Sequence, residues 1–198
     1  MRREESVSVD TYPSFAALAA REVRGSDYDL DVQLRLSSRV AVIAPHGGGI
    51  EPETSRIAQS IAGAEFSFYS FRGLKRKGNR SLHITGHHFD EPECLRLLAR
   101  HEWVVAIHGC AARGERVFLG GLDDALKSEF VAELTNTGIT LKTSNHPFLG
   151  LHPRNVCNRG SRHAGVQFEL SLPFRRGKHV AQFVDALRRV LARRQNQA

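Results

Sequence analysis

Long hydrophobic runs are absent from this sequence, because no apolar stretch approaches the ~20 residues that a membrane-spanning helix needs. The charged residues at the N-terminus, Met1 to Ser6, are not followed by the apolar segment of a secretory signal peptide. No low-complexity run, internal repeat or linker occurs. We therefore expect one cytoplasmic domain over residues 1–198, monomeric and without membrane contact, in which residues 1–11 are flexible and residues 193–198 form a tail.

Cysteine is scarce, with three residues, Cys94, Cys110 and Cys157, and no C-x-x-C pair. An odd number of cysteines without such a pair is typical of a reduced, cytoplasmic protein. Cys110 and Cys157 each follow a motif of the kind found at functional sites. A disulfide between these two therefore remains an alternative.

Acidic residues are outnumbered, since 28 Lys and Arg against 21 Asp and Glu leave a formal net charge of +7. Such a chain attracts polyanions. Part of the excess lies in a predicted amphipathic helix over residues 178–194, where arginines gather near the end. A nucleic-acid site would interleave aromatic residues with the basic ones, and this cluster has none. Nucleic acid is therefore not the expected partner.

The sequence does contain an alternation of strand-like and helix-like segments in an ordinary globular composition, 41% hydrophobic and 25% charged. The alternation predicts an α/β fold, a three-layer sandwich around a mixed, largely parallel sheet. The expected strands are residues 32–36, 40–44, 66–71, 103–107, 117–119, 140–142 and 166–170, and the expected helices are residues 14–23, 56–62, 91–100, 123–135 and 178–194.

One predicted strand, residues 40–44, leads into Pro45, His46, three glycines and Glu51. We expect the strand to end before Pro45, which cannot donate a ladder hydrogen bond. A glycine-rich turn that cradles a phosphate is an alternative, but no Lys or Ser/Thr follows the glycines as in a P-loop. An imidazole and a carboxylate are instead two of the three protein ligands of a catalytic zinc of the His₂Glu type.

A second histidine, His108, follows the predicted strand 103–107 and precedes a glycine, as His46 does. A lone histidine at a strand end more often has a structural role, but two His-Gly strand ends with an acid nearby favour a metal site. Weaker candidates are His83, His87, His88, His101, His146, His152, His163 and His179.

Several ordered segments resemble the poly-γ-glutamate hydrolase family of phages and bacteria, whose members are sometimes labelled phage-related replication proteins. The resemblance covers roughly positions 12–192. Its segments are Ala44-Pro-His-Gly-Gly-Gly-Ile-Glu-Pro52, Phe68-Tyr-Ser-Phe71, Gly78-Asn-Arg-Ser-Leu-His-Ile-Thr85, Phe89-Asp-Glu-Pro92, Ala106-Ile-His-Gly-Cys110, Gly120-Gly-Leu-Asp123, Asn155-Val-Cys-Asn-Arg-Gly160 and Gly165-Val-Gln-Phe-Glu-Leu-Ser171.

The resemblance implies a zinc-dependent hydrolase, related in fold to the zinc carboxypeptidases, that cleaves γ-glutamyl amide bonds of an anionic polymer. The family's metal motif falls on His46, Glu51 and His108, and implies one Zn²⁺ per chain. The residues alone leave other classes open. These are another metal-dependent amidohydrolase, such as an N-acyl amino acid deacylase or a peptidoglycan amidase, and a non-enzymatic polyanion or nucleic-acid binder.

Glu169 lies within the predicted strand 166–170, on the same face as Gln167. An unpaired carboxylate is costly to bury, so Glu169 could face water on an edge strand. The resemblance instead implies that Glu169 is the general base, which deprotonates the attacking water and protonates the leaving amine.

Two Asn-Arg pairs, Asn79-Arg80 and Asn158-Arg159, each neighbour a glycine and could be surface turns. A γ-glutamyl chain, however, carries one α-carboxylate per residue, and an arginine binds a carboxylate bidentately. Asn79-Arg80 also resembles the pair with which zinc carboxypeptidases hold a substrate carboxylate, although its distance in sequence from the metal ligands is shorter. We therefore expect Asn79, Arg80 and Arg159 to contact the substrate, or Arg159 to stabilise the oxyanion.

Overall fold

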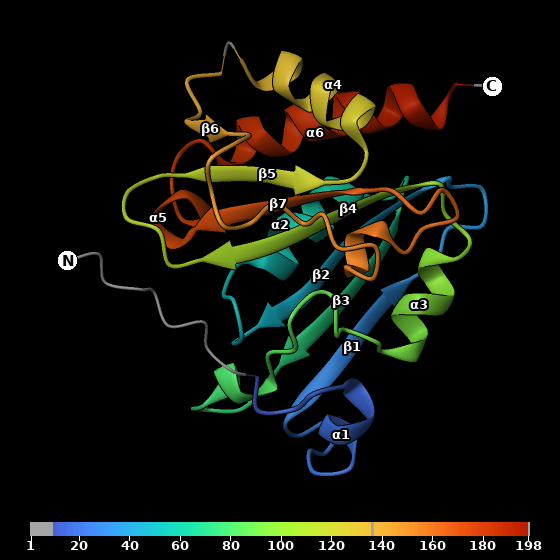
Figure 1. The fold of residues 1–198 in the computed structure, drawn as a ribbon, viewed down its shortest axis with the longest axis vertical. Coiled ribbons are helices and arrows are strands. Elements are labelled where there is room, and N and C mark those ends of the chain that lie inside the picture. Colours follow the sequence, from blue (N-terminus) through green and yellow to red (C-terminus); the bar gives the residue numbers. More distant parts are fainter. Residues whose placement is uncertain (1–9, 136, 198) are drawn as a thin grey trace.

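A mixed sheet forms the centre of the computed structural model, which describes residues 10–135 and 137–197 (Figure 1). Over these residues the sheet has seven strands in the order β1-β3-β2-β4-β7-β5-β6. Strands β3, β2, β4 and β7 are parallel neighbours, β5 and β6 are parallel to each other, and the β1–β3 and β7–β5 pairs are antiparallel. The strands are β1 (Tyr28–Gln33), β2 (Val40–Gly48), β3 (Ser67–Gly73), β4 (Trp103–Cys110), β5 (Val117–Gly121), β6 (Leu141–Lys142) and β7 (Val166–Ser171).

Helices cover both faces of the sheet, because alternate strand residues point to opposite sides and both sides are apolar. On β4, Val105 and Ile107 pack into one hydrophobic cluster, and Val104 and Ala106 pack into the other. The first cluster includes α2 (Thr54–Ala62), α4 (Asp124–Leu134) and α6 (Val180–Gln195). The second includes α1 (Phe15–Ala19), α3 (Pro92–Leu98) and the 3₁₀ turn η2 (Val156–Asn158). The expected three-layer α/β sandwich is confirmed.

Strand β2 runs further than predicted, through Pro45 and His46 to Gly48. The ladder with β3 shifts its register between Ala44 and Gly47, and the pairs with β4 end at Ile43. Pro45 therefore lies in an irregularity where no ladder donor is needed, and the expectation that the strand stops before it was wrong. Strand β4 likewise continues to Cys110, so His108 lies within a strand rather than after one.

Several other predicted element boundaries differ from the observed ones by a few residues. The predicted strand 32–36 is β1, four residues earlier, and the predicted helix 14–23 is reduced to the five residues of α1. Of the expected tail 193–198, residues 193–195 belong to α6. The expectation that residues 1–11 are flexible concerns mainly residues 1–9, which lie outside the described part. No helix in the described ranges combines the length and hydrophobicity needed to span a bilayer.

A buried histidine gives the fold a dependence on pH. His101 is 1% exposed; its Nδ1 lies 2.7 Å from the Leu97 carbonyl oxygen and its Nε2 lies 2.8 Å from Ser67 Oγ. Because a carbonyl only accepts, Nδ1 donates and Nε2 accepts from the serine hydroxyl. Burial lowers the pKa of His101 below its usual value. The unfolded chain therefore binds a proton at a higher pH than the folded chain does.

We expect the free energy of unfolding to be independent of His101 above pH ~6.5 and to fall as the pH drops below that value, by at most ~1.4 kcal/mol per pH unit for this one group. The measurement is denaturant unfolding from pH ~7.5 to ~5, with metal chelated. His101→Gln should reduce the slope, and His88→Gln, at an exposed histidine, should not. Equal slopes in His101→Gln and the parent would contradict the assignment.

Candidate metal centre

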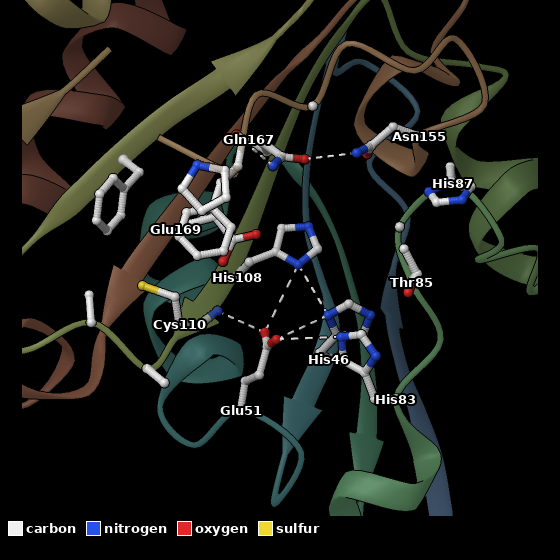
Figure 2. Close-up of a pocket in the computed structure, with 18 of the residues that line it drawn as sticks. His46, Glu51, His83, Thr85, His87, His108, Cys110, Asn155, Gln167 and Glu169 are labelled. Carbon is white, nitrogen blue, oxygen red and sulfur yellow. Dashed lines mark hydrogen bonds and ion pairs between the residues drawn. The ribbon is translucent and has the colours of Figure 1, made fainter. Parts of the chain in front are cut away.

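Two imidazoles and one carboxylate converge at the carboxyl ends of β2 and β4 (Figure 2). The Nδ1 atoms of His46 and His108 are 3.1 Å apart. Glu51, on the loop after β2, places Oε1 3.3 Å from His46 Nδ1 and Oε2 4.0 Å from His108 Nδ1. One candidate ligand atom from each of these side chains lies within 4.8 Å of the others. The three residues selected from the sequence thus form one cluster.

A hydrogen bond at Nε2 leaves Nδ1 as the nitrogen of His46 that can bind a cation. His46 Nε2 lies 2.8 Å from the Ile84 carbonyl oxygen, which can only accept, so Nε2 carries the proton and Nδ1 has a free lone pair. His108 directs its Nδ1 at the same point, and its buried Nε2 has no hydrogen-bond partner in the described structure. Two facing lone pairs repel each other unless a proton or a metal ion lies between them.

Glu51 is held in place by backbone contacts on both sides. Its Oε2 accepts a hydrogen bond of 2.7 Å from the Gly109 N–H, and its own N–H donates to the His46 carbonyl at 2.9 Å. The turn between them needs glycine at Gly48, where φ is +61° and a Cβ would lie 2.5 Å from the Gly73 carbonyl oxygen. The glycine run therefore brings Glu51 back to His46, rather than forming a phosphate loop.

This donor set fits a zinc ion. Ligand atoms ~2.0–2.2 Å from a tetrahedral zinc are ~3.3 Å from one another, which is close to the 3.1 Å and 3.3 Å separations here and shorter than the remaining 4.0 Å. Two neutral imidazoles and one carboxylate leave the fourth position of such a site open. The hydrogen bond from His46 Nε2 to the Ile84 carbonyl oxygen gives further support, because metal-binding histidines are commonly oriented by such a bond at their other ring nitrogen.

Mutual charge interactions determine the protonation states in the metal-free cluster. Burial disfavours the Glu51 carboxylate, but the adjacent His46 outweighs burial and lowers the pKa of Glu51 to about 2. Burial also disfavours the His46 imidazolium, but Glu51 raises the pKa of His46 above its usual value. Burial, together with His46, lowers the pKa of His108 to about 3. Glu51 is therefore ionised and His108 neutral at physiological pH, as a metal ligand requires.

We expect the apparent affinity for zinc to fall as the pH drops, because His46 must lose a proton to bind the ion and its pKa is raised. Displacing one proton costs up to ~10-fold in apparent affinity per pH unit below that pKa, and nothing above it. Competition with a chromogenic chelator from pH ~5.5 to ~8 measures this dependence. An affinity that stays constant over the whole range would contradict a role for His46 as ligand.

Glu169 lies beside the cluster. Strand β7 pairs in parallel with β4 so that the Cα of Glu169 is opposite that of His108, and both side chains line one pocket (Figure 2). Because β7 lies between β4 and β5, Glu169 is not on an edge strand. Burial, with a further contribution from the Glu51 charge, raises the pKa of Glu169 well above its usual value. A half-buried carboxyl with a raised pKa beside candidate ligands suits general acid–base chemistry.

The pocket beside the cluster has a volume of about 840 Å³. Its lining includes the apolar residues Phe118, Pro147 and Phe148 and the polar residues Arg80, His83 and His87. The pocket therefore offers a cationic side chain to an anionic ligand together with apolar surface.

Of the three residues expected to contact substrate, only Arg80 is among the pocket-lining residues. The Asn79 amide instead accepts from the Lys75 N–H and donates to the Lys75 carbonyl, which holds a turn together. Arg159 follows η2 and is not among the pocket-lining residues either. Spacing in the sequence could not show which of these side chains line the pocket. The direction of the Asn79 amide, for example, is fixed by its hydrogen bonds to the Lys75 backbone.

His83, one of the weaker candidates from the sequence, lies against the metal cluster. Its ring centroid lies 4.1 Å from that of His46, its Nδ1 lies 2.8 Å from Asp10 Oδ1, and its Nε2 lies 3.9 Å from Glu51 Oε1. Asp10 also accepts from the Thr85 N–H at 2.6 Å. One signal was available, since His83, Thr85 and His87 alternate toward the pocket while Leu82 and Ile84 are buried in the core.

The cysteines do not form a disulfide, because Cys94, Cys110 and Cys157 are all free and buried. Cys110 lines the pocket, but burial raises the pKa of its thiol to about 11. It is therefore a neutral thiol at physiological pH and a poor nucleophile.

Comparison with known proteins gives the same family from three directions. The family model described as poly-gamma-glutamate hydrolase matches residues 12–195. The UPF0714 protein YndL of Bacillus subtilis (strain 168) is 38% identical over 169 residues, which cover 84% of this chain and 66% of YndL. The chain thus spans about two thirds of the length of this curated relative.

Solved structures agree. A bacteriophage poly-gamma-glutamate hydrolase superposes with a TM-score of 0.89 at 29% identity, covering 94% of this chain and 98% of the phage chain. YndL in a form described as apo and zinc-free superposes with a TM-score of 0.86 at 33% identity, over 93% and 98% of the two chains. N-formylglutamate amidohydrolase from Ralstonia eutropha, with a TM-score of 0.54 at 12% identity over 86% and 97%, shares the fold.

The match of the family model to nearly all of the sequence, the curated relative at 38% identity and the superposition on a phage hydrolase lead to one assignment. This chain belongs to the poly-γ-glutamate hydrolase family.

Proposed function

We propose that this protein is a zinc-dependent hydrolase that cleaves the γ-glutamyl amide bonds of poly-γ-glutamate. The observation that carries the proposal is the convergence of His46, Glu51 and His108 on one point, with Glu169 opposite His108 on the next strand. Family membership supports the substrate, and the description of one YndL structure as zinc-free supports the metal.

His46 and His108 would hold the ion through Nδ1, and Glu51 through its carboxylate. Zinc in such a site lowers the pKa of a bound water to ~7 and polarises a carbonyl group. The Gly109 N–H and the Ile84 carbonyl keep Glu51 and His46 oriented without substrate. Ligand geometry therefore does not depend on the polymer.

Glu169 takes a proton from the water that attacks the γ-amide carbon and returns it to the nitrogen of the leaving α-amine. Its raised pKa suits both steps. A carboxyl group that holds its proton more tightly than usual is a stronger base, and it can still donate that proton as an acid. Water oxygen becomes part of the new carboxylate, and the amine leaves with the transferred proton.

Arg80, which lines the pocket, would bind an α-carboxylate of the polymer. The net charge of +7 attracts a polyanion over a longer range. Substrate affinity should therefore decrease with salt, while chemistry at the metal should not.

The test is zinc content of the purified protein together with hydrolysis of poly-γ-glutamate, followed by product size, with and without a chelator. We expect about one zinc per chain, and activity that is lost on chelation and restored by added zinc. Hydrolysis of N-acyl amino acids or peptidoglycan fragments in place of poly-γ-glutamate would assign a different amidase to the same site. Polymer binding without hydrolysis, insensitive to chelator, would contradict an enzymatic role.

A further inference from the structure

A buried arginine lies behind the metal cluster, on the other side of β4 from the pocket. Arg175 ends the short helix α5 (Leu172–Arg175), which follows β7 directly, and is only 4% exposed. Its Nε is buried without a hydrogen-bond partner in the described structure. Burying a guanidinium is costly unless its charge and its donors are compensated. The position of Arg175 therefore calls for an explanation.

The first contact of Arg175 is with the backbone at Gly109. A Cβ added to Gly109 would lie 2.6 Å from the guanidinium carbon of Arg175, so the guanidinium occupies the space where a side chain would be. Gly109 sits between His108 and Cys110, both of which line the pocket, and its own side-chain direction is on the opposite face. The N–H of this same glycine donates to Glu51 Oε2 at 2.7 Å.

The second contact is with the loop that carries Glu51. Arg175 Nη1 donates to the carbonyl oxygen of Pro52, the residue after Glu51. Arg56, in the first turns of α2, donates from Nη2 to the Arg175 carbonyl at 3.4 Å. One guanidinium therefore touches both backbone segments that hold Glu51, its own loop and the strand that hydrogen-bonds its carboxylate.

Charge also favours this location. Burial lowers the pKa of Arg175, while the negative charges of Glu51 and Glu169 oppose that effect. The cation thus lies within the electrostatic range of both carboxylates of the site without forming an ion pair with either. A residue that served only to fill the core would not need a charge here, because Phe174 and Val180 supply apolar packing in the same region.

We propose that Arg175 is a positioning residue that fixes the loop at Pro52 against β4 at Gly109, and so presents the Glu51 carboxylate to the metal ion. This inference rests on the proposed zinc site. Arg175 does not contact the substrate or the ion; it acts through the backbone around Glu51.

The test compares zinc affinity, by chelator competition, in Arg175→Met, Arg175→Lys and Arg176→Met. Methionine keeps much of the side-chain length but removes the charge and the donors. We expect Arg175→Met to lose ~10–100-fold in zinc affinity, the range seen when a group that supports a ligand is changed. Arg175→Lys keeps the charge and one donor for Pro52 and should recover most of this loss. Arg176, exposed and adjacent, is the matched control and should not change the affinity.

A spectroscopic readout separates positioning from general destabilisation. With Co²⁺ in place of zinc, displacement of Glu51 should change the visible absorption of Arg175→Met but not of Arg176→Met. If Arg175→Met folds poorly, Gly109→Ala offers a second route, since its Cβ would push the guanidinium away. The two changes act on one contact, so their effects on zinc affinity should be less than additive in the double variant.

Unchanged zinc affinity and an unchanged cobalt spectrum in Arg175→Met would overturn the inference. So would an equal loss in the lysine variant, which would show that a charge and a donor for Pro52 do not hold the loop in place. Failure of the parent protein to bind zinc at all would instead overturn the proposed function.

Discussion

Glu169→Gln is expected to reduce hydrolysis of poly-γ-glutamate by at least ~10²–10⁴-fold while zinc remains bound. The substitution keeps the size of the side chain and removes its ability to take a proton. Glu169 is the carboxylate opposite His108 in the sheet, and it is not one of the three candidate ligands. Loss of turnover without loss of metal is therefore the specific signature of a general base.

The measurement is kcat and KM for the polymer, with zinc determined on the same samples by elemental analysis. We expect the effect in kcat, because the proton transfer occurs in the transition state. Glu65→Gln, at an exposed acid paired with Arg188, is the control and should behave as the parent. Unchanged activity would remove Glu169 from the mechanism, and loss of zinc would make it a ligand instead.

His46→Ala should abolish zinc binding itself. The imidazole supplies one of three protein donors, and its loss also leaves the Glu51 carboxylate without the partner that lowers its pKa. The decrease in affinity should exceed the ~10–100-fold that follows when only a supporting group is changed. Activity should disappear with the metal and should not return at micromolar zinc.

Zinc content and a zinc-dependent rise in the melting temperature measure this effect. The parent should gain stability on zinc addition, because the ion binds the folded chain, and His46→Ala should gain little. His88→Ala, which changes an exposed histidine, should retain both zinc and its stabilisation. A full complement of zinc in His46→Ala would place the metal elsewhere and would refute the cluster as the site.

Local patterns were sufficient for much of the fold. Apolar runs such as residues 40–44 and 103–107 are strands because both faces of a parallel sheet are covered by helices, so the burial signal is continuous. The boundaries were less accurate where the ladder changes, as at Pro45. Proline excludes a regular ladder position, but a register shift removes the need for its N–H.

The metal candidates could be predicted for a similar reason. In parallel strands the carboxyl ends meet at one edge of the sheet, so the sequence predicts both His-Gly motifs at that edge. They lie close together because β2 and β4 are neighbours there. The position of Glu169 beside the cluster could not be inferred without the strand order. The sequence does not say whether β7 pairs with β4 or lies at an edge of the sheet. Neither Asn79 nor Arg159 is among the residues that line the pocket, so their contact with substrate stays a prediction. The sequence does not reveal the hydrogen bonds with Lys75 that fix the direction of the Asn79 amide.

The sequence by itself determined which segments are strands and helices, which side chains could bind a metal, and the excess of positive charge. Only the tertiary structure decided that His83 and Asp10 reach the cluster, that Arg80 faces the pocket while Asn79 does not, and that Arg175 lies behind Gly109. The physical reason is the separation in sequence between the residues that interact. Periodicity and residue type record what each segment buries, whereas the contacts between residues far apart in the chain depend on how separate segments pack.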